Sequence, residues 1–267
     1  MAKTIRPAAV AGMFYPDAPN SLRKDIGDYL NKATPPALTN VRAVIAPHAG
    51  YVYSGPVAAY AYKVLAAQPT PPKRIYLMGP SHRVWFSGVA LADYTAFNTP
   101  LGNHPLDVEK IETLAASGDP FAVRNAPHAP EHCLEVHIPF LQVVLPETPV
   151  IPILFGDVDP VFVGERLNVI LEPEDLLIVS SDLSHYHDNR TAHALDRQFV
   201  DAVLAGDLHG AARGEACGQA PAIALMIIAA KRGWRAHLLD YRTSGDVTGD
   251  TGHVVGYAAI AYVEETL

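Results

Sequence analysis

Residues 41–55 read VRAVIAPHAGYVYSG, and this stretch decides how the chain can fold. Its first six residues form an apolar run, which is typical of a strand buried on both faces of a sheet. Pro47 ends the run, and His48 follows at once, so the sheet would present this histidine where the chain turns. An ordinary loop histidine fits this position, and so does a metal-ligating or acid–base histidine.

The rest of the chain repeats this pattern of short apolar runs separated by segments with helical periodicity. The runs are 41–46, 74–79, 89–92, 150–155, 175–181, 235–241 and 254–263, and the predicted helices are 20–33, 56–67, 107–117, 159–171, 189–205 and 221–232. Such alternation predicts an α/β fold: a layered α/β/α single domain spanning residues 1–267, with a mostly parallel or mixed central sheet.

The last two runs have no helix between them, and GDVTGDTG at 245–252 indicates a hairpin turn. We therefore expect an antiparallel edge at the C-terminal end of the sheet. Residues 131–145 also have a helical pattern, although Pro139 should kink this helix or delay its start.

Composition excludes several classes of protein. A hydrophobic fraction of 49% with 18% charged residues is that of a compact globular chain. The net charge of −8 argues against a nucleic-acid or anionic-membrane surface. No apolar run approaches the ~20 residues that a membrane span needs, and the first residues lack the apolar core of a secretory signal. With only two cysteines in the chain, we expect no disulfide framework. We therefore expect a cytoplasmic location.

Donor side chains gather at the predicted strand ends, where ligands bind in open α/β sheets. They are His48 after the first run, His82 after 74–79, Asp182 and His185 after 175–181, Cys217 ahead of the 221–232 helix, and, from the stretch HAPEHCLEVH at 128–137, His132 and His137. Two imidazoles with one anionic ligand suit Fe(II), Cu or Zn and leave positions open for a substrate. A thiol at a helix N-terminus also favours the thiolate form.

Each of these residues taken alone has a structural interpretation as well. Asp182 could cap a turn, Cys217 could be a small buried residue, and the histidines could be satisfied loop residues. Glu131 and Glu135 are four residues apart, for which we expect a solvated helical face. The coincidence of several donor-rich strand ends favours a site.

Six motifs in order resemble those of the Memo family, whose bacterial and archaeal members are often called AmmeMemoRadiSam system protein B. They are IRPAAVAGMFYP (5–16), APHAGYVYSG (46–55), MGPSH (78–82), EHCLEVHIPFL (131–141), VSSDLSHY (179–186) and EACGQAPA (215–222). The resemblance implies a fold similar to that of the class III extradiol dioxygenases, which hold non-haem Fe(II) with two histidines and a glutamate. In Memo-like proteins a cysteine takes the place of that glutamate.

The resemblance implies a role for each candidate residue. One transition metal ion would be held by His48, His82 and Cys217. The softer thiolate shifts the preference towards Cu(I), Zn or thiolate-ligated Fe, and of these we expect Fe or Cu before Zn. Of the other candidates, His185, Asp182 and His132 would be catalytic, and Phe14, Tyr53 and His137 would contact the substrate.

Four functions stay open at this point. The first is a metal-dependent dioxygenase- or oxidoreductase-like enzyme acting on a small molecule or peptide. The second is a metal- or peptide-binding module without turnover. The third is a subunit of a complex with radical-SAM and AMMECR1-like partner proteins, which the resemblance implies. The fourth is a cysteine hydrolase that uses Cys217 with His185.

Overall fold

The structure, a computed structural model, describes residues 4–265. Its strands are β1 (Thr4–Arg6), β2 (Val41–Ala46), β3 (Arg74–Pro80), β4 (Val89–Leu91), β5 (Tyr94–Thr99), β6 (Gly102–Pro105), β7 (Phe121–Val123), β8 (Val150–Phe155), β9 (Asp175–Ser180), β10 (His185–His187), β11 (Trp234–Thr243) and β12 (Val254–Glu264). Its helices are α1 (Pro19–Lys32), α2 (Tyr51–Ala66), α3 (Val108–Ala116), α4 (Asn125–His128), α5 (Ile138–Val144), α6 (Pro160–Ile170), α7 (Asn189–Ala205), α8 (Leu208–Arg213), α9 (Gln219–Arg232) and α10 (Gly245–Thr248), with a 3-10 turn, η1 (Glu135–His137).

The central sheet is mixed, as predicted. Its order is β10-β12-β2-β9-β3-β8-β4-β7, and β11 pairs with β12. The four middle strands β2, β9, β3 and β8 run parallel, so their carboxyl ends share one edge of the sheet. Strand β12 is antiparallel to both β2 and β11, which confirms the antiparallel C-terminal edge.

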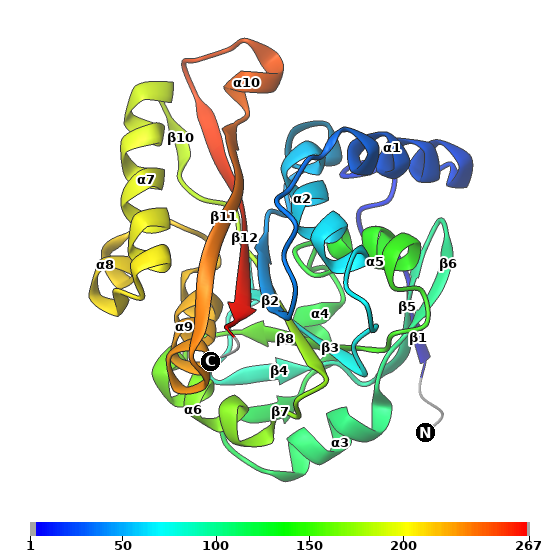
Figure 1. Ribbon diagram of the computed structural model, residues 1–267. Coiled ribbons are helices and arrows are strands. Elements are labelled where there is room, and N and C mark those ends of the chain that lie inside the picture. The colour runs from blue at the N-terminus through cyan, green and yellow to red at the C-terminus, as the bar shows by residue number, and fades with distance from the viewer. Residues whose placement is uncertain (1–3, 266–267) are drawn as a thin grey trace.

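Helices cover both faces of this sheet (Figure 1). Helix α2 packs on β2 and β12 and also contacts α1 and α5, which together form one outer layer. Helix α9 packs on β9 and β3 and contacts α6, and α7 packs on β11, which forms the other layer. The middle strands are buried along nearly their whole length, because helices lie on both sides. This arrangement is the predicted α/β/α fold.

Helix α2 begins at Tyr51, five residues before the predicted start at Pro56. Proline is favoured in the first turn of a helix, which is why its position misled the prediction. The earlier turn forms because Tyr51 is buried, its backbone N–H donates to the Phe14 carbonyl at 2.8 Å, and its hydroxyl donates to the Val136 carbonyl at 2.7 Å. The added turn brings the start of α2 against the segment that precedes α1.

The connection at 245–252 joins β11 and β12 as a hairpin, but it is not a tight turn. It contains the single-turn helix α10, which ends at Gly249 with a left-handed φ of 75°. The helix predicted over residues 131–145 starts late, as expected from Pro139. Residues 135–137 form η1, and α5 begins only at Ile138. A second sheet, which was not predicted from the sequence, has the order β1-β5-β6.

The solvated face expected for Glu131 and Glu135 is wrong, because both side chains are buried. Glu135 forms an ion pair with Arg6, which is itself buried, and accepts hydrogen bonds from the backbone N–H groups of Ala9 and Val10 and from the Tyr15 hydroxyl. Burial of a carboxylate is tolerated here because every oxygen has donors. Glu135 thereby ties the N-terminal segment to the edge where the parallel strands end.

Candidate metal centre

Three histidines converge at the carboxyl ends of the parallel strands. His48 follows β2, His82 follows β3, and His132 lies just before η1. Their ligating atoms all lie within 4.8 Å of one another. The ring centroid of His48 lies 5.2 Å from that of His82 and 5.4 Å from that of His132. The ring centroids of His82 and His132 are 4.8 Å apart. One metal ion could be held by such a group.

Hydrogen bonds assign the tautomer of His48. The Ser180 hydroxyl donates to the Cys133 carbonyl at 2.8 Å, so its oxygen is left to accept the proton of His48 Nδ1 at 2.6 Å. Nε2 of His48 therefore carries a free lone pair. Burial lowers the pKa of His48 well below its usual value, and the neighbouring His82 and His132 lower it further. The imidazole is thus neutral at neutral pH, which is the form that binds a metal.

His82 is held by a carboxylate. Its Nδ1 donates to Glu131 Oε1 at 2.9 Å, so its Nε2 is also left free. The ligand atoms of His82, Glu131 and Cys133 form a second group within 4.8 Å. In that group, however, the Cys133 N–H donates to Glu131 and its thiol donates to the Pro80 carbonyl at 3.1 Å. Hydrogen bonds join the members of this second group, and burial raises the pKa of Cys133 well above its usual value.

Cys217 lies beside His48. Its Sγ is 3.4 Å from His48 Nε2 and accepts the Asp182 N–H at 3.2 Å. Among the described residues, no set of three donor atoms within 4.8 Å of one another includes Cys217, so its place as third ligand stays a prediction. Burial, and next the carboxylate of Asp182, raise its pKa. Burial thus opposes the thiolate that was expected at this helix N-terminus.

Asp182 holds the backbone that carries His48. Its Oδ1 accepts the His48 N–H at 2.7 Å, and its Oδ2 is 3.9 Å from His48 Nε2. The pKa of Asp182 is raised, mainly by burial. The predicted acid–base residue His185 starts β10, and its N–H donates to Glu215 at 3.1 Å. The catalytic roles of Asp182, His185 and His132 stay predictions.

The predicted substrate-contacting residues differ in their surroundings. The Phe14 ring lies 4.7 Å from that of His132, so it does form a wall of the cluster. Tyr53, in the first turn of α2, is 41% exposed. His137 is buried, its Nδ1 is 2.6 Å from the Tyr62 hydroxyl, and burial lowers its pKa to about 3. His137 is therefore neutral and lies beneath the surface, while Phe14 and Tyr53 are nearer to solvent.

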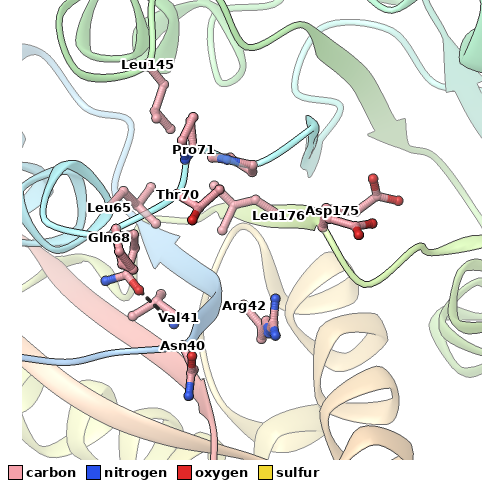
Figure 2. A pocket seen from close by; sticks show the side chains of 13 residues that line it. Asn40, Val41, Arg42, Leu65, Gln68, Thr70, Pro71, Leu145, Asp175 and Leu176 are labelled. Carbon is pink, nitrogen blue, oxygen red and sulfur yellow. Dashed lines mark hydrogen bonds between the residues drawn. The ribbon is translucent and has the colours of Figure 1, made fainter.

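A pocket of about 360 Å³ opens next to Cys217. It is lined by the segments that follow β3 and β8, including the largely exposed Trp85, and by the start of α9. Another pocket, of about 240 Å³, lies at the opposite end of the strands, where Val41 and Asp175 begin β2 and β9 (Figure 2). None of the described residues that line the latter pocket is a histidine or a cysteine, so it has no part in the metal centre.

Two residues that order the cluster, Ser180 and Glu131, were not recognised as site residues from the sequence. Ser180 is the last residue of β9, which is apolar between its first and last residues. A hydroxyl at the end of such a strand was the feature of the sequence that could have indicated a site residue. Glu131 is 49 residues away from His82 in the chain, and no local pattern connects them.

The fold and this site define a mixed α/β protein with a group of imidazoles and thiols at the carboxyl edge of its sheet, where a metal ion could be held. A family profile described as "Memo-like protein" matches residues 6–261. The chain belongs to the Memo family. Within residues 4–265, no helix has both the length and the apolar character needed to cross a membrane.

The relatives cover almost the whole chain. A MEMO1 family protein of Nitrosopumilus maritimus is 34% identical over 97% of this chain and 100% of its own length. Another, from Methanothermobacter thermautotrophicus, is 36% identical over 96% of this chain and 100% of its own length. The crystal structure of uncharacterized protein JW3007 from Escherichia coli K12 superimposes with a TM-score of 0.50 at 14% identity, covering 82% of this chain and 99% of that one, which shows similarity of fold alone. The expected likeness to extradiol dioxygenases stays a prediction.

Proposed function

We propose that the chain is a mononuclear metal protein with dioxygenase- or oxidoreductase-like activity on a small molecule or peptide. The observation that carries this proposal is the convergence of His48, His82 and His132, with the Nε2 lone pairs of His48 and His82 left free by Ser180 and Glu131. Neutral imidazoles with fixed tautomers are the usual ligands of first-row transition metals.

The proposed ligands are His48, His82 and Cys217, with His132 as their neighbour. Metal–nitrogen and metal–sulfur bonds of ~2.0 and ~2.3 Å at a tetrahedral angle would separate the two ligand atoms by roughly 3.5 Å. Nε2 of His48 and Sγ of Cys217 are 3.4 Å apart, which fits a shared ion. Metal binding would then replace the proton that burial keeps on the thiol. A thiolate ligand suits Cu(I), Zn and Fe, and of these we propose Fe or Cu.

A bound iron or copper ion would supply Lewis-acid and redox chemistry. The protein side chains would position the reactants around it. Phe14 shields the face of His132, and Asp182 fixes the backbone of His48. We propose that His185 or His132 moves the proton during the reaction.

A metal- or peptide-binding module without turnover is the second candidate. It is favoured by exposed aromatic side chains near the centre. Tyr53, in the first turn of α2, is 41% exposed, and Tyr186, whose ring centroid lies 5.7 Å from that of His185, is 74% exposed. Radical-SAM and AMMECR1-like partner proteins, and a cytoplasmic location, belong to the proposal as well. Oxygen uptake with catechols and other reductants separates this candidate from the first.

Metal quantification after anaerobic purification tests the proposal. We expect about one iron or copper per chain, loss of the metal in His48→Ala, and retention in His187→Ala, a histidine that pairs with Glu215 outside the cluster. Loading with Co²⁺ identifies the third ligand, since a thiolate adds a charge-transfer absorption that Cys217→Ser should abolish. Absence of metal in the wild-type protein, with no Co²⁺ binding, would remove the basis of the proposal.

A further inference from the structure

One buried carboxylate, that of Glu131, accepts four N–H groups at the centre. Its Oε2 accepts the backbone N–H of His82 at 2.6 Å. Its Oε1 accepts His82 Nδ1–H at 2.9 Å and the backbone N–H groups of His132 at 3.0 Å and Cys133 at 3.1 Å, and it also lies 3.1 Å from the ring nitrogen Nδ1 of His132. Two of the three clustered histidines therefore depend on one side chain that is only 2% exposed.

Both oxygens of the Glu131 carboxylate accept N–H groups and neither donates, which is the pattern of an ionised carboxylate. The buried cation Arg6 forms its ion pair with Glu135. Its contact with Glu131 is a hydrogen bond to the backbone carbonyl and not to the carboxylate. The charge of Glu131 is thus directed at the histidines.

Glu131 is engaged as a hydrogen-bond acceptor through both oxygens. Oε1 has three N–H donors and Oε2 has one, so most of the about four acceptor sites of the carboxylate are occupied. Packing holds it in place, because the turn that carries it lies directly on the end of β3. A Cβ added at Gly79 would be 2.8 Å from Cys133 Sγ and from a methyl carbon of Leu134.

We infer that Glu131 is a positioning residue that holds His82 with its proton on Nδ1 and turns the Nε2 lone pair of His82 toward the point shared with His48 and His132. The inference rests on the proposed metal binding. An acceptor on the far nitrogen fixes the ring and raises the basicity of the ligating nitrogen, and loss of such a partner typically weakens metal affinity 10–100-fold.

Two measurements on the full chain test this inference. The first is ¹⁵N NMR of histidine rings in metal-free wild-type protein, with the His82 signals assigned by their absence in His82→Asn. We expect the Nδ1–H tautomer. The second is Co²⁺ titration of Glu131→Gln. The amide of this variant places an N–H group opposite the His82 N–H, which donates to a carboxylate oxygen in the wild-type protein. We expect 10–100-fold weaker binding and a mixed His82 tautomer.

Asp175→Asn is the matched control. It also neutralises a buried carboxylate, but at the opposite end of β9, where its side chain accepts the Glu172 N–H. Its Co²⁺ affinity should stay within twofold of wild type. An Nε2–H tautomer of His82 in wild type, or unchanged affinity in folded Glu131→Gln, would overturn the inference. The tautomer result decides the matter even if Glu131→Gln does not fold, and a wild-type protein without Co²⁺ affinity would instead refute the proposed function.

Discussion

Replacing Gly218 by alanine should displace Cys217 from the metal centre. A Cβ at this position would lie 2.4 Å from the Ser180 carbonyl oxygen and 2.5 Å from Ser181 Cβ, about 1 Å short of ordinary contact. Ser180 cannot yield easily, because it ends β9 and pairs with Ala46 in the middle of the sheet. The backbone at residue 218 must therefore move away, and it takes the adjacent Cys217 with it.

The displacement has two measurable costs. Overpacking at a rigid site costs about 1–3 kcal/mol of unfolding free energy, and the Gly218 N–H would also lose its 2.9 Å hydrogen bond to Ser181 Oγ. A shift of this size separates Cys217 Sγ from His48 Nε2, which are now 3.4 Å apart. We expect Co²⁺ affinity to fall roughly 10–100-fold, as for other losses of ligand positioning, with a weaker thiolate charge-transfer absorption.

Urea unfolding and Co²⁺ titration of Gly218→Ala, beside Gly27→Ala, provide the assay. Gly27 lies inside α1, and a Cβ there meets nothing within 4 Å. Alanine at position 27 should therefore stabilise the fold by about 0.5–1 kcal/mol without changing metal affinity. Wild-type stability together with Co²⁺ affinity within twofold of wild type in Gly218→Ala would refute the reasoning.

Three further predictions concern stability and the tautomer of His48. Arg6→Met leaves Glu135 buried without its cation and should cost about 3–5 kcal/mol in urea unfolding, whereas a loss below 1 kcal/mol would contradict a buried pair. Burial lowers the pKa of His128 to about 4, so the unfolded state binds the proton first and stability should fall as pH drops from about 6.5 toward 4. The free energy of unfolding should fall by on the order of 2 kcal/mol at pH 5. In urea unfolding, the free energy of unfolding of His128→Gln should depend less on pH than that of the wild-type protein. Ser180→Ala removes the acceptor of His48 Nδ1–H and should weaken Co²⁺ binding about 10-fold, while equal affinity would assign the His48 tautomer to another group.

The sequence predicts the central sheet well because burial on both faces leaves a clear local signal. Strands β2, β3, β8 and β9 are apolar almost throughout, and each coincides with a predicted run. The start of α2 was missed because its first turn depends on contacts with Phe14 and Val136, which are distant in the chain. Tertiary contacts of this kind override the local preference of Pro56 for a helix start.

The same distinction applies to the site. His48 and His82 were recognisable because each directly follows a parallel strand, so that sheet geometry alone brings them to one edge. The place of Cys217 and the tautomers of the rings depend on hydrogen bonds between segments far apart in the chain, such as Ser180 with Cys133. Helical periodicity was misleading at Glu131, since residues 131–134 form no helix.

Glu131 and Glu135, which the four-residue spacing would place together on a solvated face, have separate buried tasks. Glu131 accepts the His82 ring N–H and the His132 backbone N–H, and so orders two rings of the centre. Glu135 binds Arg6 and the backbone of residues 9 and 10, which fixes the segment that carries Phe14 against His132. The stretch EHCLEVH thus joins the metal centre to its aromatic wall through two carboxylates. Neutralising Glu131 should therefore alter metal affinity, whereas breaking the Arg6 pair should first loosen the wall.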